Sequence, residues 1–212
     1  MKTDDLINAI SADTQAARAP INWIVWGGVA VGVVLTALLF SMLLSVRPNF
    51  EAALGDWRFL MKWAFSLTLL TTAVALTMRL ARPQWVSDTT LLVLLGAPLV
   101  LMAGIFAEML TLPANYWLPT MVGDNALACV IYIPILSSLP LAAMIMALRQ
   151  GAPSRPVVAG ATAGLVAAGI AATFYATHCT NDSPMFLGAW YLLGTAIVTA
   201  AGALLGAKLL RW

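Results

Sequence analysis

The chain has 212 residues, of which 61% are apolar and only 9% are charged. A soluble domain has about 25% charged residues, so the eleven cationic and nine acidic residues are too few to cover a water-exposed surface. This composition excludes a soluble enzyme, a disordered regulator and a nucleic-acid binder of the basic-patch type. The sequence therefore predicts an integral membrane protein.

Six apolar stretches are long enough to cross a bilayer as helices, which takes about 20 residues each. They cover residues 23–46, 59–80, 89–112, 125–148, 156–177 and 185–210. The first stretch is longer than a signal-peptide core and no convincing cleavage site follows it, so we expect it to remain as an anchor. The predicted fold is an all-α integral membrane protein. It has an amino-terminal tail, residues 1–20, and a six-transmembrane-helix bundle, residues 21–212.

Lysines and arginines are distributed unequally between the two sides of this bundle. Eight lie on the side of both termini: Lys2, Arg18, Arg79, Arg82, Arg149, Arg155, Lys208 and Arg211. The opposite side has Arg47, Arg58 and Lys62. Because cytoplasmic loops carry the excess of cationic residues, both termini are predicted to be cytoplasmic. Loops 47–58, 113–124 and 178–184 are then predicted to face outward.

Small residues recur four positions apart in three of the spans. The pairs are Gly28 and Gly32, Gly160 and Gly164, and Gly202 and Gly206. Such pairs let helix backbones approach closely in lipid. We expect them to pack the spans of one chain together, and a homodimer face is left open as the alternative. Pro134 and Pro140 lie within the fourth span, where each removes a backbone donor and can bend the helix.

Both cysteines fall on the side that is predicted to face outward. Cys129 follows Asp124 by five residues, which places it about 7 Å below the outer surface at 1.5 Å per residue. Cys179 ends the fifth span. In a Gram-negative bacterium this side is the oxidising periplasm, where cysteine pairs form disulfides. The pair comes within bonding range if the fourth and fifth helices are neighbours, and for Cys129 an inert buried thiol is the alternative.

Four further residues near the outer side are candidate metal ligands or neighbours of such ligands. They are His178, Asp182, Glu108 and Met185. Thiolate, imidazole and thioether groups suit soft or borderline ions such as copper(I) or zinc, although the spacing matches no zinc motif. Structural interpretations stand beside this one. His178 ends a helix, Glu108 reaches the membrane interface, and Asp182 or Ser183 caps the sixth span with Pro184 in its first turn.

The common catalytic motifs are missing from the sequence. The chain has no nucleophile elbow, phosphate-binding loop, paired catalytic carboxylates or zinc-protease motif, and no Cys-x-x-Cys pair. No charged residue lies near the middle of a span, which argues against an ion pump or a proton-coupled carrier. We therefore expect a protein that is not an enzyme, with no resident cofactor indicated.

The amino-terminal tail has the pattern of a short helix. Thr3 or Asp4 is a suitable cap, and the carboxylates of Asp4 and Asp5 are favourable in a first helical turn. Leu6 and Ile10 belong to a narrow apolar stripe. Membrane-surface helices are rich in lysine and arginine, whereas this one is acidic, so we expect it to bind a basic protein partner. A tail without stable structure is the alternative.

Four stretches of the chain carry a family resemblance. They are MKTDDLINAISAD, CVIYIPILSSLPLAAMIMALRQGAPSRP, FYATHCTNDSPMFLGAWYLLG and GAKLLRW. With these stretches, its length and its six spans, the chain resembles the NrsF-type membrane anti-sigma factors. These are negative regulators of a sigma-F-like extracytoplasmic-function (ECF) sigma factor. The resemblance extends over the whole chain.

The resemblance implies a multi-pass protein of the bacterial inner membrane, surrounded by lipid, that holds an ECF sigma factor inactive. It further implies release of that sigma factor under metal or oxidative stress. Cys129 and Cys179 match the family's two cysteines, and Asp4 and Asp5 match its acidic amino-terminal pair. The expected signal is oxidation of the thiols, or copper or another soft metal ion that acts on them. The alternative is a small transport or metal-handling bundle with a structural cysteine pair.

Overall fold

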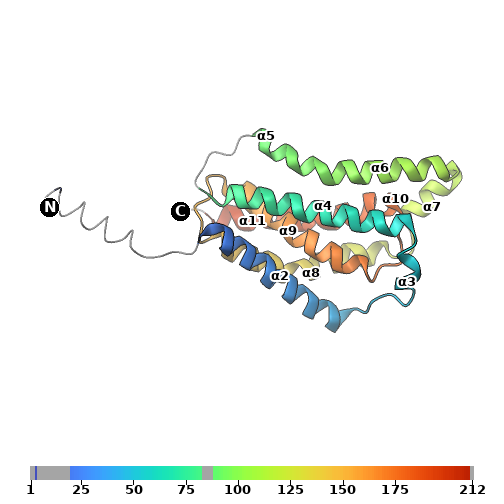
Figure 1. Cartoon of the computed structure of the whole chain (residues 1–212), viewed down its shortest axis with the longest axis horizontal. Helices are drawn as coiled ribbons and strands as arrows, with labels where there is room; N and C mark the ends of the chain where they lie inside the picture. Colours follow the sequence, from blue (N-terminus) through green and yellow to red (C-terminus); the bar gives the residue numbers. More distant parts are fainter. Residues whose placement is uncertain (1–2, 4–19, 83–87, 211–212) are drawn as a thin grey trace.

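The computed structural model describes residues 3, 20–82 and 88–210, and these residues form a bundle of helices (Figure 1). Six segments in the described residues are long and apolar enough to cross a membrane. They are Ile21–Leu43, Trp57–Leu80, Thr89–Thr111, Ala126–Leu148, Pro156–Ala176 and Pro184–Leu209. The all-α fold and the predicted order of six spans are confirmed, with ends that differ by at most three residues from those expected.

Four of the spans are single helices: α2 (Ile21–Leu43), α4 (Trp57–Leu80), α8 (Ala126–Leu148) and α9 (Pro156–Ala176). The third span consists of α5 (Asp88–Leu91), the 3-10 segment η1 (Leu92–Leu95) and α6 (Gly96–Thr111). The sixth consists of α10 (Pro184–Phe186), the π-helical segment η3 (Leu187–Tyr191) and α11 (Leu192–Leu209). Three short helices lie between spans: α3 (Phe50–Ala53), η2 (Ala114–Tyr116) and α7 (Trp117–Val122).

The bundle has two ends, which lie on opposite sides of Figure 1. α2 begins and α11 ends at the terminal end, and the connections 44–56, 112–125 and 177–183 form the cysteine end. The connection 112–125 was expected to be a plain loop, but it contains η2 and α7. Its apolar residues pack α7 against α10 and η3, and Trp190 Nε1 donates a hydrogen bond to the Met121 carbonyl at 2.9 Å.

The centre of the bundle is α9, the most buried of the six spans, whereas the third span is the least buried. α9 contacts α2, α4, α8 and α11. Where it crosses α11, glycines face glycines: Gly160 and Gly164 on one side, Gly202 and Gly206 on the other. A Cβ on any of the four would come within 3.0 Å of the opposite backbone. The expectation that these small residues pack spans of one chain is confirmed for this crossing.

α2 and α8 interlock around a proline. Pro140 has no N–H for the carbonyl of Leu136, the residue one turn earlier, and the hydroxyl of Thr36 on α2 donates to that carbonyl at 3.4 Å. A Cβ on Gly32 would lie 2.9 Å from Pro140 Cβ, so the small residue makes room for the proline ring. Gly28 meets Ala147 in the same way, one turn further along. α2 and α8 are therefore in close contact at these positions.

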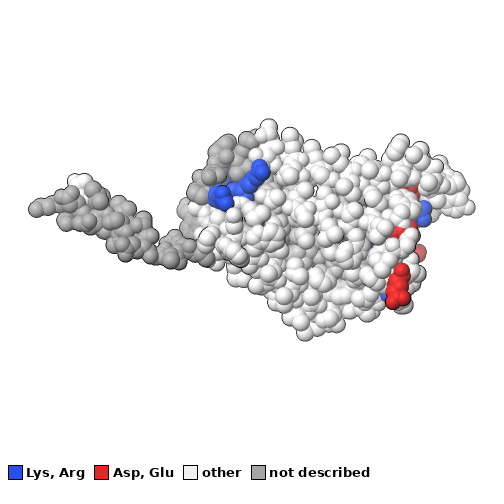
Figure 2. All heavy atoms as spheres, in the orientation of Figure 1, with Lys and Arg blue, Asp and Glu red and all other residues white. Residues whose placement is uncertain are grey.

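Charged residues gather at the two ends of the bundle (Figure 2). The terminal end has the described cations Arg79, Arg82, Arg149, Arg155 and Lys208, on the side that the charge count assigned to them. Lys2, Arg18, Arg211 and the tail residues Asp4, Asp5, Leu6 and Ile10 lie outside the described residues. The tail helix therefore stays a prediction, as does the cytoplasmic orientation of the terminal end.

Candidate thiol site

Two helices bring the cysteines to one place. Cys129 lies in the first turn of α8, and its N–H donates to the Asn125 carbonyl at 3.1 Å. Cys179 follows the end of α9, and its N–H donates to the Tyr175 carbonyl at 2.9 Å. α8 and α9 are packed neighbours, and the two free thiols are near enough for Cys129 to shift the pKa of Cys179. The structure thus places the two cysteines next to each other, while their role as a sensor stays a prediction.

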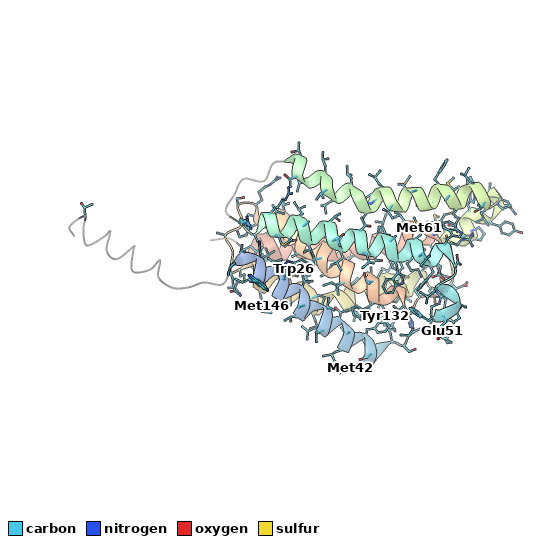
Figure 3. The ribbon with its side chains drawn as sticks, in the orientation of Figure 1. Trp26, Met42, Glu51, Met61, Tyr132 and Met146 are labelled. Atoms are coloured by element: carbon cyan, nitrogen blue, oxygen red, sulfur yellow. The ribbon has the colours of Figure 1, made fainter. Side chains whose placement is uncertain are left out.

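Tyrosines enclose this thiol pair. The thiol of Cys129 contacts the Tyr175 hydroxyl at 3.7 Å, and the Tyr175 ring stacks on Tyr132 and packs against Tyr191, with ring centroids 6.2 and 5.8 Å apart. Figure 3 shows Tyr132 toward the same end of the bundle as Glu51, whereas Trp26 lies toward the other end. Cys129 has no exposed surface and Cys179 only 2%. The thiols are therefore shielded from bulk solvent although they lie near an end of the bundle.

Two cations converge on the connection that follows Cys179. Lys62 Nζ lies 2.6 Å from Asp182 Oδ1 and donates to the Cys179 carbonyl at 3.0 Å. Arg47 Nη1 lies 2.7 Å from Asp182 Oδ2 and 3.4 Å from the same carbonyl. The interpretation of Asp182 as a helix cap was wrong, because its carboxylate is the shared counter-ion of these two buried cations.

The thiol of Cys179 differs electrostatically from an ordinary cysteine. Its hydrogen bond with Cys129 lowers its pKa, and so does the nearby charge of Lys62, whereas burial and Asp182 act in the opposite direction. The lowering contributions are larger, so the pKa lies below the usual range. Because the thiolate is the nucleophilic form of cysteine, this environment favours a reactive sulfur at position 179.

A second polar cluster links the third span to the same connection. Glu108 was expected at the membrane interface, but it is fully buried. Its Oε2 accepts hydrogen bonds from the Ser183 hydroxyl at 2.5 Å and from the Met185 N–H at 3.3 Å. Arg58 Nε lies 3.0 Å from Oε1 without hydrogen-bond alignment, so this contact is an ion pair only. The chain avoids an isolated buried carboxylate in this way.

Ser183 begins the sixth span as predicted. Its hydroxyl accepts from the N–H groups of Met185 and Phe186, and Pro184 occupies the first helical turn. Since the same hydroxyl donates to Glu108, one side chain both caps α10 and fastens it to α6.

The candidate metal ligands are not gathered into one cluster. Within the described residues, no group of three or more His, Cys, Asp and Glu side chains is placed to hold a metal ion. Asp182 and Glu108 face cations instead, and Met185 contacts Glu108 through its backbone. His178 Nδ1 lies 2.7 Å from the Ser45 carbonyl. The predicted metal role therefore depends on the two thiols and has no further carboxylate donor at hand.

Lys62, Arg47 and Tyr175 belong to this site although the sequence analysis did not assign them to it. One signal was available for Lys62, because a lysine inside a span is costly unless it has an acidic partner. Nothing in the sequence identified that partner as Asp182, which lies 120 residues away.

A cavity reaches one of the two cysteines. It has a volume of about 250 Å³ and lies at the cysteine end. Its lining consists of Ser45, Val46, Arg47, Pro48, Asn125, Ala128, Tyr175, His178, Cys179 and Thr180. Cys129 is not part of that lining. A small molecule that enters here meets Cys179.

The fold and the site together define a multi-pass helical membrane protein with a buried thiol pair and two buried cations at one end. Comparison with known proteins adds the family. The family of negative regulators of sigma F, NrsF, matches residues 10–212, and the chain belongs to it. The resemblance seen in the sequence is thereby confirmed.

Two relatives match over their whole length and the whole of this chain. The protein named "Probable anti-sigma-F factor NrsF" from Azospira oryzae is 34% identical over 226 aligned positions. "Anti-sigma-F factor NrsF" from Caulobacter vibrioides is 32% identical over 219. No solved structure matches the chain.

Proposed function

We propose that this chain is a membrane-bound anti-sigma factor. It holds a sigma-F-like ECF sigma factor at the bacterial inner membrane and releases it when metal or oxidative stress in the periplasm oxidises Cys129 and Cys179. The family and the names of two full-length relatives support the regulatory function and the kind of partner.

The observation that carries the sensor is the contact between the two thiols. Cys129 lies on α8 and Cys179 just after the end of α9, and the two free thiols are near enough for Cys129 to shift the pKa of Cys179. A disulfide has an S–S bond of about 2.05 Å, which is shorter than any contact between unbonded sulfurs. Oxidation therefore draws the start of α8 toward the end of α9, and a change in the position of α8 is the expected signal.

The packing of α8 against α2 provides a path by which a change in the position of α8 reaches the terminal end of the bundle. α2 follows the amino-terminal tail directly and interlocks with α8 at Gly32, Thr36 and Pro140. Pro134 lies between Cys129 and this contact and is the candidate bend. The energy required is small, because a tenfold weaker affinity for the sigma factor needs about 1.4 kcal/mol.

Copper or another soft metal ion acts in this proposal as a signal that promotes thiol oxidation, and not as a bound cofactor. The charges at the site support this assignment. Lys62 and Arg47 lie beside Cys179, and both repel a metal cation. The nearest carboxylate, Asp182, is neutralised by the same two cations.

Serine substitutions test the sensor in cells that carry a reporter for a sigma-F-dependent promoter. Cys129→Ser and Cys179→Ser should each abolish induction and retain repression, because a disulfide needs both sulfurs. The sigma factor should co-purify with each variant before and after stress, whereas it should leave the wild-type protein on stress. Ser137→Ala is the matched control, since Ser137 is equally buried on the same helix and donates only to the Ile133 carbonyl.

Full induction in the double variant Cys129→Ser, Cys179→Ser would falsify the sensor and leave the cysteines as packing residues. Failure of any sigma factor to co-purify with the unstressed wild-type protein would contradict the anti-sigma function itself. The two failures are separate, because co-purification with the unstressed protein does not depend on the thiols.

A further inference from the structure

The two thiols have unequal access to the outside. The cavity of about 250 Å³ at the cysteine end is lined by Cys179, Tyr175, His178 and Arg47, but not by Cys129. Cys129 lies behind them, within the apolar cluster of α8 and α9 and against the Tyr175 hydroxyl. A molecule that enters the cavity therefore reaches Cys179 before Cys129.

The charges around the two thiols are also unequal. Both Lys62 and Arg47 donate to the carbonyl of Cys179, so two positive charges lie next to this residue. The hydrogen bond from Cys129 and the charge of Lys62 lower the pKa of Cys179. The titratable or charged groups that face it are Arg47, Lys62, Cys129, Tyr175, His178, Asp182 and Tyr191. Of these, Asp182 disfavours the thiolate, but it is paired with both cations.

We infer that Cys179 is the thiol that reacts with the oxidant, that Cys129 closes the disulfide, and that Lys62 is the positioning residue that sets this order. The inference rests on the proposed function, because it assigns roles within the same cysteine pair. The oxidant is a small hydroperoxide. Ligand pockets for drug-sized molecules measure about 300–1,000 Å³, so a cavity of about 250 Å³ admits a small molecule and excludes the active-site loop of a protein oxidant.

The reaction has two balanced steps. In the first, the Cys179 thiolate attacks one oxygen of the hydroperoxide. An S–O bond forms with the hydroxyl oxygen and the O–O bond breaks. The other oxygen leaves as alkoxide, or as hydroxide when the oxidant is hydrogen peroxide, so that Cys179 becomes a sulfenic acid. In the second step the sulfur of Cys129 attacks the sulfenic sulfur, the S–S bond forms, and the sulfenic oxygen leaves with the thiol proton of Cys129 as water. The pair loses two electrons and the hydroperoxide gains them.

Single-cysteine proteins show which thiol reacts first. The full chain is purified in detergent and reduced, and hydrogen peroxide is added with dimedone, which traps sulfenic acids. Cys129→Ser keeps Cys179 and a hydroxyl donor beside it, so it should form the dimedone adduct. Cys179→Ser should form it at least tenfold more slowly. After denaturation both variants should react at similar rates, which shows that the folded surroundings cause the difference.

Lys62→Met in the Cys129→Ser background tests the positioning residue. The rate of alkylation of Cys179 by iodoacetamide is measured against pH. With Lys62 in place, the alkylation rate of Cys179 should begin to fall only at a lower pH than the rate of an ordinary thiol. Lys62→Met should shift this pH profile to higher pH. Arg58→Met is the matched control, because Arg58 lies on the same helix but pairs with Glu108, and it should leave the profile unchanged.

Each outcome decides a separate point. If hydrogen peroxide produces no disulfide in the reduced wild-type protein, the proposed sensor is wrong and this order is wrong with it. If the disulfide forms but Cys129 is trapped at least as fast as Cys179, the order alone is overturned. An unchanged pH profile in a folded Lys62→Met protein, or an equal shift in Arg58→Met, removes Lys62 from its assigned role.

Discussion

Lys62 and Asp182 form an ion pair of 2.6 Å between α4 and the connection after α9, and the lysine side chain has no exposed surface. Arg47 joins the same carboxylate at 2.7 Å. One acidic residue therefore neutralises two buried cations. The same two cations also donate hydrogen bonds to the carbonyl of Cys179. This arrangement makes the connection around Cys179 dependent on Asp182.

The first prediction follows from this imbalance of charge. Asp182→Asn leaves two buried cations without a counter-ion and should lower the stability by about 3–5 kcal/mol. Lys62→Met should cost less, because Asp182 keeps Arg47. The double variant should be more stable than the sum of the two single effects indicates. Chemical unfolding of the purified protein in detergent measures all three, and strict additivity would show that the pair is not coupled.

The second prediction concerns Glu108. Glu108→Gln should weaken the hydrogen bonds to Ser183 and Met185 and cost about 1.5–3 kcal/mol, the range for bonds to charged groups. The ion pair with Arg58 should contribute little, because that side chain is 35% exposed. Hydrogen exchange at the amides of Met185 and Phe186 should become faster.

The exposed Glu51 provides the control for this change. Glu51→Gln should leave both the stability and the exchange rates as they are. Equal behaviour of the two glutamine variants would show that Glu108 does not fasten the third span to the sixth.

The limits of the sequence analysis are visible in these same residues. Length and hydropathy defined the six spans because each is an apolar run long enough to cross a bilayer. Ser183 was predicted as a cap because capping is local in sequence. Asp182 and Glu108 were misread because their partners, Lys62 and Arg58, belong to another span, and one sequence does not state which spans touch. The contact between Cys129 and Cys179 was foreseen only on the condition that their helices are neighbours.

The third prediction tests the crossing of α9 and α11. Gly160→Ala should destabilise the protein by about 1–3 kcal/mol or more, because the new Cβ would overlap the Gly202 carbonyl oxygen. Gly27→Ala is the matched control, since a Cβ there has no neighbour within 4 Å, and it should change the stability by less than about 0.5 kcal/mol. Thermal unfolding in detergent compares the two, and equal effects would contradict the close packing at Gly160.

The fourth prediction concerns orientation. Reporter fusions after Gln150 and at the carboxyl terminus should behave as cytoplasmic, and a fusion after Asn181 as periplasmic, because the cationic residues concentrate on the side of the termini. The combination of an alkaline phosphatase fusion and a fluorescent protein fusion at each site gives opposite signals on the two sides. The inverse pattern would place both cysteines in the reducing cytoplasm and end the case for a periplasmic sensor.

The fifth prediction concerns the tail, of which residues 1–2 and 4–19 lie outside the described residues and residues 1–9 outside the family match. Asp4→Ala with Asp5→Ala should release the sigma factor and give constitutive output at an unchanged level of protein in the membrane. The two carboxylates of the predicted tail helix favour a basic partner surface, so binding of the sigma factor to the wild-type protein should also weaken as salt is added. Asp13→Ala, further along the same tail, should retain repression. If the double variant represses normally, the docking element lies elsewhere, and the arginines of the terminal end, Arg79, Arg82, Arg149 and Arg155, become the residues to substitute next.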